Sequence, residues 1–178
     1  MKIFLLVLSL GLLAGCAGDI AVRIAAPEQQ SSASLARVTV NDLRKPGVAA
    51  SKREAAFGTP MGNITFVPPE TELVARRLEA ELTRQLREAG VASPRSFVCD
   101  LVEFGVNTDT TPFYWDVVGR VRLVLKDGDR QYPLLGTATR RTFIWPGEDI
   151  IAAVVGESLA QVDAGLEQIA RAVAAGSR

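Results

Sequence analysis

The fold is decided by the stretch Trp115-Asp116-Val117-Val118-Gly119-Arg120-Val121-Arg122-Leu123-Val124-Leu125-Lys126. Successive side chains of a β-strand point to opposite faces of a sheet, so a period of two divides this stretch into two faces. The odd-numbered face is uninterruptedly apolar, from Trp115 to Leu125. The even-numbered face carries four charged side chains, with Val118 and Val124 among them. The pattern therefore predicts a strand with one buried face and one face open to solvent.

Two further strand-like segments flank this stretch. Asp127-Gly128 follows it and is a strong hairpin turn signal. Residues 130–145 then return as the partner strand. Residues 96–107 precede it, joined to it through a turn at 109–112. Three consecutive strands joined by short turns predict an antiparallel meander.

Two amphipathic segments stand on either side of the meander. Each repeats apolar residues every third or fourth position, as a helix with one buried face does. The first contains Val74, Leu78, Leu82, Leu86 and Ala89, and the second contains Val155, Leu159, Val162, Leu166, Ile169 and Val173. Because both helices need a surface to cover, we expect an α+β two-layer sandwich, with a mostly antiparallel sheet of about four to five strands and both helices on one face.

The region before the first helix is less regular. Residues 35–43 alternate as a strand, and the alternation of residues 20–24 leaves open a further short strand. Residues 44–63 show no period and predict a loop, which at this length is usually functional or disordered. Two bulky apolar side chains, Phe57 and Met61, stand in this segment. They fit either a loop clipped onto the domain or a partner-binding loop.

The first sixteen residues form a targeting segment. Lys2 precedes an apolar run of about eleven residues, which as a helix spans roughly 16 Å and is too short for a ~30 Å hydrocarbon core. The run closes on Leu13-Ala14-Gly15-Cys16, so the segment has the parts of a secretory signal peptide. It resembles the signal and lipobox of bacterial lipoproteins. That resemblance implies cleavage before Cys16, which then carries a diacylglyceryl group and an N-acyl chain.

These features divide the chain into three parts. Residues 1–15 are the expected signal peptide, residues 16–34 the lipidated cysteine and a tether, and residues 35–178 a single periplasmic domain of ordinary size. In Gram-negative lipoproteins an Asp directly after the cysteine retains the protein in the inner membrane. Because Ala17 stands there instead, the resemblance implies the outer membrane, periplasmic face.

Composition narrows the chemistry. The sequence contains 20 basic residues (Lys and Arg) and 20 acidic residues (Asp and Glu), so no overall positive charge favours the binding of nucleic acid. Histidine is absent from the sequence, which removes the commonest general base and metal ligand. We therefore expect no metal, no cofactor beyond the covalent lipid, and no enzymatic activity. Cys99 has no partner once Cys16 is lipidated, and we expect it to be a small buried hydrophobe.

Carboxylate-only chemistry remains a third interpretation. It rests on four acids in strand-like segments: Asp42, Asp100, Glu103 and Asp116. It requires a deep pocket that holds two of these acids with raised pKa values.

The candidate binding residues lie on the polar face of the meander. Arg120, Arg122 and Lys126 share that face, and Arg140 joins them if the hairpin register allows. Such a basic stripe suits anionic lipid head groups, lipopolysaccharide or an acidic protein surface, whereas the alternative is an ordinary solvated face. A group of aromatic residues at the outer ends of the meander fits packing at the edge of the core or a ligand site. The group consists of Phe113, Tyr114, Trp115, Phe143 and Trp145.

The order of elements after the lipobox carries a resemblance. The order is strand, long loop, helix, three meander strands and helix, and the residues concerned are 38–44, 78–90 and the meander with the last helix. It resembles the small envelope lipoproteins of the YajG family and, in element order only, LptE and the amino-terminal domain of TolB. The family implies no catalytic residue.

Two functions follow as expectations. The first is a non-catalytic outer-membrane lipoprotein that binds an envelope protein partner in envelope organisation or assembly. The alternative is an accessory lipoprotein that handles lipid or lipopolysaccharide, like LptE or the auxiliary lipoproteins of ABC transport systems.

Overall fold

The computed structural model describes residues 18–27, 34–45, 51–55 and 59–176. The expected signal peptide, Cys16 and Phe57 lie outside these residues. The described elements are β1 (Ile20–Arg23), β2 (Ala36–Asp42), β3 (Ser51–Ala55), β4 (Thr59–Val67), α2 (Glu70–Glu88), β5 (Arg95–Thr110), β6 (Trp115–Asp127), β7 (Arg130–Thr142) and α3 (Glu148–Ala175).

The strands form one open, mixed sheet of seven strands in the order β1-β4-β3-β5-β6-β7, with β2 also paired to β5. The predicted meander is confirmed, because β5, β6 and β7 are antiparallel neighbours. The α+β class with two helices is confirmed as well. The expectation of four to five mostly antiparallel strands was only partly right. The described sheet has more strands, seven in all, and two of its pairings, β1 with β4 and β2 with β5, are parallel.

The described residues 51–55 and 59–63 form strands, whereas the sequence predicts a loop over 44–63. They contain β3 and the start of β4, which pair as an antiparallel hairpin with Ser51 opposite Ile64. The alternation was hidden because a charged residue occupies an inward position, where Arg53 is only 7% exposed. Met61 lies within β4, and its carbonyl accepts a hydrogen bond from the Gly18 N–H at 2.9 Å.

The ordered fold also extends N-terminal of residue 35, into the segment expected to be tether. β1 pairs with β4 over Ile20–Arg23, and its Val22 side chain is completely buried. A short strand in this segment was left open by the sequence. It belongs to the sheet because residues 64–67 of β4, where the sequence also allows a short strand, supply its partner.

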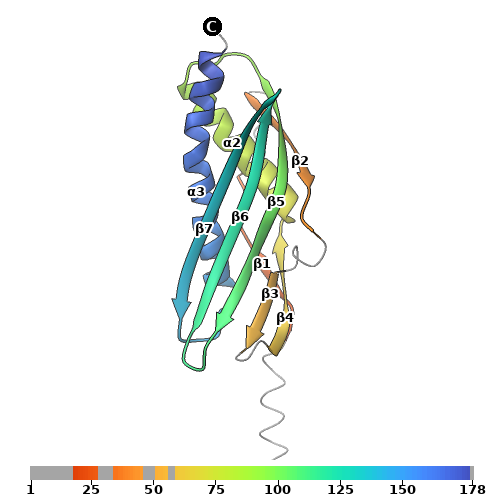
Figure 1. Cartoon of the computed structure of the whole chain (residues 1–178), viewed down its shortest axis with the longest axis vertical. Coiled ribbons are helices and arrows are strands. Elements are labelled where there is room, and N and C mark those ends of the chain that lie inside the picture. Colours follow the sequence, from red (N-terminus) through yellow and green to blue (C-terminus); the bar gives the residue numbers. More distant parts are fainter. Residues whose placement is uncertain (1–17, 28–33, 46–50, 56–58, 177–178) are drawn as a thin grey trace, which may run out of the picture.

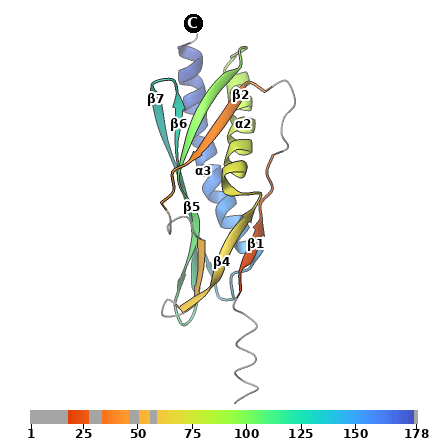
Figure 2. The ribbon, with the colours of Figure 1, turned by 90° about the vertical axis from the view of Figure 1, so that its right-hand side faces the viewer.

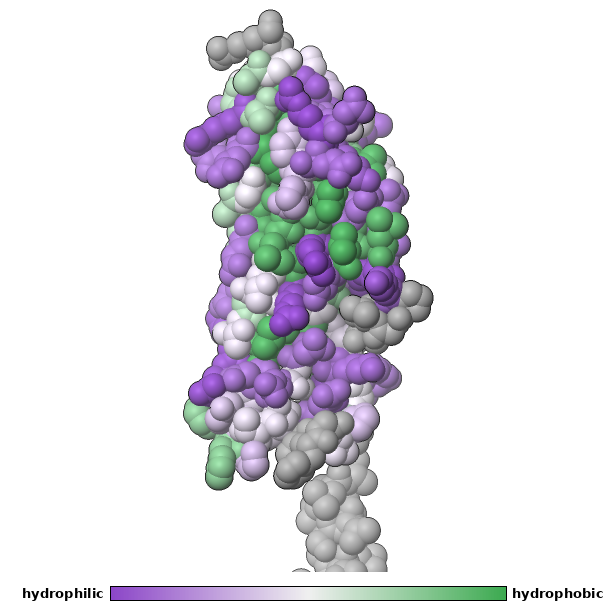
Figure 3. Space-filling view, viewed as in Figure 1, coloured by the Kyte–Doolittle hydropathy of each residue, from purple (hydrophilic) through white to green (hydrophobic). Residues whose placement is uncertain are grey.

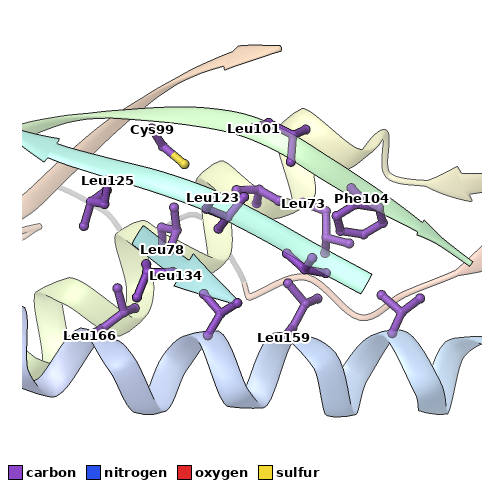
Figure 4. Close-up of a cluster of buried hydrophobic side chains, with 14 of the residues drawn as sticks. Leu73, Leu78, Cys99, Leu101, Phe104, Leu123, Leu125, Leu134, Leu159 and Leu166 are labelled. Atoms are coloured by element: carbon purple, nitrogen blue, oxygen red, sulfur yellow. The ribbon is translucent and has the colours of Figure 1, made fainter. Parts of the chain in front are cut away.

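Both helices cover the same face of the sheet (Figures 1 and 2). The predicted apolar faces of α2 and α3 point inward, and Leu78 and Leu166 are among their fully buried residues. Figure 4 shows these side chains meeting those of β5, β6 and β7 in one core, with Cys99 among them. α2 ends at Glu88, and Gly90, two residues further on, has a φ of 78° that suits glycine.

α3 lies unusually close to the sheet, and two glycines make this possible. A Cβ at Gly136 would lie 1.8 Å from the Ser158 carbonyl oxygen, and one at Gly119 would lie 2.7 Å from a Val154 methyl group. The Ser158 hydroxyl is completely buried and donates to the Val154 carbonyl at 2.9 Å. Any side chain larger than hydrogen at these two sheet positions would push the helix away.

Helix side chains also cover the sheet edges. On β2, the Ala36 N–H donates to Thr83 Oγ1 at 3.2 Å and the Val38 N–H to Glu79 Oε1 at 2.9 Å, both on α2. On β7, the Gln161 side chain of α3 bonds to both the N–H and the carbonyl of Thr137. These contacts occupy backbone groups that would otherwise be open to another strand.

None of the helices among the described residues is long and apolar enough to cross a membrane.

The close approach of α3 to the sheet predicts that alanine substitutions of two glycines have very different effects on stability. Gly136→Ala should lower the free energy of unfolding by about 3 kcal/mol or more, because the clash is with rigid backbone. Gly156→Ala should leave stability unchanged or raise it by up to about 1 kcal/mol, because nothing lies within 4 Å of its Cβ position and alanine favours helix. Urea unfolding followed by circular dichroism measures both. A Gly136→Ala protein as stable as the wild type would contradict the packing described.

Candidate functional site

The candidate site is the outer face of the sheet, opposite the helices. Along β6 the odd-numbered positions 117–125 are buried, whereas Arg120 and Arg122 are exposed and Lys126 is half-buried. The predicted parity of β6 is therefore confirmed. Of the described helices, α2 and α3, neither lies on this face, which Figure 3 views directly.

The basic stripe is largely neutralised by acids of the neighbouring strand. Arg122 Nη2 lies 2.9 Å from Glu103 Oε2, and Lys126 Nζ lies 2.5 Å from Asp100 Oδ2, both acids being on β5. For Arg120, no ion pair is found within the described part of the chain. The face therefore presents paired charges and one additional cation rather than a continuous positive field.

Arg140 does not join the stripe. In the hairpin register Arg140 is opposite Val117, which is an inward position, and directly paired residues share a face. Its guanidinium reaches Glu157 of α3, with Nε 3.0 Å from Oε1, and this hydrogen bond raises the pKa of Arg140. The outer face at this end instead carries Arg141, which bonds to Asp116 at 2.8 Å.

Between the ion pairs lies an apolar surface, which we call the outer patch: Val98, Val124, Pro133 and Leu135. Val124 is its centre, because Pro133 is directly opposite it and Val98 and Leu135 lie on its diagonals. Leu135 is 64% exposed and Val98 is 38% exposed. Figure 3 shows hydrophobic surface gathered here among charged side chains. Sequence analysis missed the patch because it is assembled across three strands.

The four strand acids are held as charged partners of basic groups. Asp42 bonds to Arg44 at 2.7 Å, Asp100 to Lys126, Glu103 to Arg122 and Asp116 to Arg141. Hydrogen bonds from these basic side chains hold the pKa values of Asp42, Asp100 and Asp116 below their usual range. The raised pKa values that the carboxylate interpretation requires are therefore not found at Asp42, Asp100 and Asp116.

Two surface cavities are lined by other residues. One, of about 180 Å³, lies between the two helices near Gln85 and Glu167, and the other, of about 460 Å³, surrounds the loop after α2. No cluster of three or more acids or cysteines suited to a metal ion occurs among the residues that the structure describes. Cys99 is completely buried, and burial raises the pKa of its thiol to about 12.

The aromatic group divides into a packed part and an exposed part. Trp115 and Trp145 stack edge to face with centroids 5.7 Å apart, and the Arg53 guanidinium lies 4.6 Å from the Trp145 centroid. Phe113 and Phe143, in contrast, are 81% and 73% exposed. Edge-of-core packing therefore describes the tryptophans but not the phenylalanines.

Comparisons with known proteins add no functional information. No family model matches the chain, and no curated protein matches it. Among solved structures, one described as the crystal structure of an uncharacterized protein matches with 11% sequence identity and a TM-score of 0.40, covering 89% of this chain and 100% of that one.

The lowered pKa of Asp100 predicts a pH-dependent contribution to stability. Because the folded pKa lies below the ordinary 3.8, the Asp100–Lys126 pair stabilises the fold above that pH, and its contribution is lost as the pH falls through the folded value. Asp100→Asn should therefore lower the free energy of unfolding by about 1 kcal/mol at pH 7, with the difference vanishing toward pH ~2.

Urea unfolding as a function of pH measures this effect. Asp129→Asn is the matched control, because Asp129 is exposed in the hairpin turn and forms no ion pair with the described residues. A stability difference for Asp100→Asn that stays constant from pH 7 to strong acid would contradict the assignment.

Proposed function

We propose that this chain is a lipid-anchored lipoprotein of the outer membrane that binds an envelope protein partner, without catalysis, through the outer face of its sheet. The anchor is Cys16, and the periplasmic face is the proposed location. Membership of a YajG-like group of envelope lipoproteins is part of the same proposal and rests on the lipobox and the order of elements.

The outer patch is the observation that carries the partner-binding proposal. Its exposed apolar side chains lie on a face without a helix, whereas the opposite face is used for the core. Clustered apolar surface with polar groups around it is typical of protein-binding sites. The flanking Arg122–Glu103 and Lys126–Asp100 pairs suit the rim of such an interface.

Face-on binding is favoured over strand addition. A partner strand would need free backbone groups along an edge, but side chains of α2 occupy N–H groups of β2, and Gln161 occupies Thr137 of β7. Pro133 removes a further donor from β7. These contacts favour the side-chain face of the sheet as the binding surface.

The lipid- or lipopolysaccharide-handling alternative is weaker on this geometry. Its residue-level support was a stripe of four cations, of which Arg122 and Lys126 are paired on the outer face and Arg140 is turned toward α3. Of these four basic residues, Arg120 alone remains available to an anionic ligand.

The anchor predicts a membrane-fractionation result. Cys16→Ser should abolish lipid attachment and release the protein from the membrane fraction, because the acyl chains supply the stable attachment. Cys99→Ala is the control and should retain the lipid, because Cys99 is buried in the core. Mass spectrometry of the N-terminal peptide and density separation of membranes measure both. Retention of Cys16→Ser in the outer-membrane fraction would contradict the anchor.

The outer patch predicts a partner-binding result. Leu135→Glu should reduce recovery of the partner at least about tenfold, because it places a charge at an apolar contact. Thr139→Glu is the matched control, since Thr139 is exposed on the same face of the same strand but opposite Val118, outside the patch. In-cell chemical crosslinking and purification of the intact lipoprotein measure recovery.

Two results would count against a protein partner. Equal recovery with Leu135→Glu and Thr139→Glu would exclude the patch as the contact. Recovery of lipid or lipopolysaccharide that is lost in Arg120→Glu would favour the accessory function instead.

A further inference from the structure

We infer that the end of the domain nearest Gly18 rests on the lipid bilayer, with the side chains of Phe113, Phe143 and Ile144 inserted among the head groups. We call these three residues the apolar tip. The inference rests on the proposed lipid anchor at Cys16 and adds a second, non-covalent membrane contact with a fixed orientation.

The apolar tip is the most exposed apolar surface in the described chain. Phe113 is 81%, Phe143 73% and Ile144 71% exposed, which exceeds the 64% of Leu135 in the outer patch. Phe113 lies in the β5–β6 connection, and Phe143 and Ile144 lie directly after β7. These two segments meet, because the Tyr114 and Phe143 rings are 6.4 Å apart. Three large side chains thus project together from one end of the sheet.

The start of the described chain is joined to the same end by a series of contacts. The Gly18 carbonyl accepts a hydrogen bond from Arg53 Nη1 at 3.1 Å, and the Arg53 guanidinium lies over the Trp145 ring. Trp145 directly follows Ile144 in sequence. Figure 1 shows β1, the β5–β6 connection and the end of β7 at the same end of the molecule, far from the C-terminus.

The short length of chain between the proposed anchor and the domain favours lipid, and not a protein, as the partner of the apolar tip. Cys16 lies two residues before Gly18, and two residues span at most about 7 Å. A lipid on Cys16 therefore holds Gly18 at the bilayer surface, and with it the end of the domain that bears the apolar tip. A protein that bound the apolar tip would have to fit between the domain and the bilayer, where the connecting chain spans only about 7 Å, whereas lipid head groups already lie there.

The chemistry of this end suits a bilayer surface. Phenylalanine and isoleucine supply the apolar part, and two tryptophans lie just behind them, as aromatic residues do at membrane interfaces. The Arg141 guanidinium lies 3.8 Å from the Tyr114 ring centroid and is bonded to Asp116, so charge stands behind the apolar tip and not within it.

The chain's two tryptophans provide a built-in probe, since Trp115 and Trp145 both adjoin the apolar tip. The lipidated full-length protein is reconstituted into vesicles of phosphatidylethanolamine and phosphatidylglycerol, with or without bromine on the acyl chains near the head groups. Brominated chains quench tryptophan fluorescence at short range. We expect quenching in the wild type and about twofold less in the variant F113S/F143S/I144S, because the domain then loses its second contact. Leu135→Ser, which removes an exposed apolar side chain away from this end, should be quenched like the wild type.

The outcomes separate this inference from the function on which it rests. Flotation of the lipidated protein with the vesicles but without quenching would overturn the membrane contact and leave the anchor standing. Equal quenching of F113S/F143S/I144S and the wild type would also overturn it. A mass showing that Cys16 carries no lipid would contradict the proposed function itself, and the inference with it.

Discussion

The close contact of α3 with the sheet, between Ser158 and Gly136 and between Val154 and Gly119, is the constraint on which the rest of the structure depends. It allows a helix of 28 residues to lie directly on β6 and β7. α3 also packs against α2, where Arg77 and Asp163 are paired at 2.6 Å, so both helices lie on one face. Because that face is fully used for the core, any recognition by the sheet has to use the other face.

Strand parity then determines what the open face contains. The Asp127–Arg130 pairing at the hairpin fixes every cross-strand neighbour on β6 and β7, and it places Leu135 beside Arg122 but Arg140 beside the inward Val117. The separate register of β5 against β6 brings Asp100 and Glu103 of β5 next to basic residues of β6. The stripe that is strongly positive in the sequence of β6 therefore consists of two ion pairs and one additional cation, Arg120, beside an apolar surface. The apolar tip near Gly18 is separate from the outer patch, so the proposed membrane contact and the proposed partner surface occupy different regions.

Much of this architecture could be predicted from the sequence, and the rest could not for identifiable reasons. The period of two in residues 115–126, the Asp-Gly turn and the two amphipathic helices correctly indicated the meander and the helical layer. β3 and residues 59–63 of β4 were missed because buried Arg53 interrupts the apolar alternation of β3, and the membership of β1 in the sheet depends on its pairing with β4. The outer patch and the position of Arg140 could be located only from the strand register, which the sequence does not give. The proposed lipidation of Cys16 rests on the lipobox resemblance and not on the fold.

A scan with a photoreactive amino acid in living cells tests the central claim most directly. The probe is placed in turn at outer-face positions of β6 and β7, including Val118, Arg120 and Leu135, and at exposed helix positions such as Arg76 and Arg171. If the open sheet face is the binding surface, a single protein partner should be captured from the sheet positions and not from the helices. Capture of that partner from the helix positions, with none from the sheet, would contradict the account.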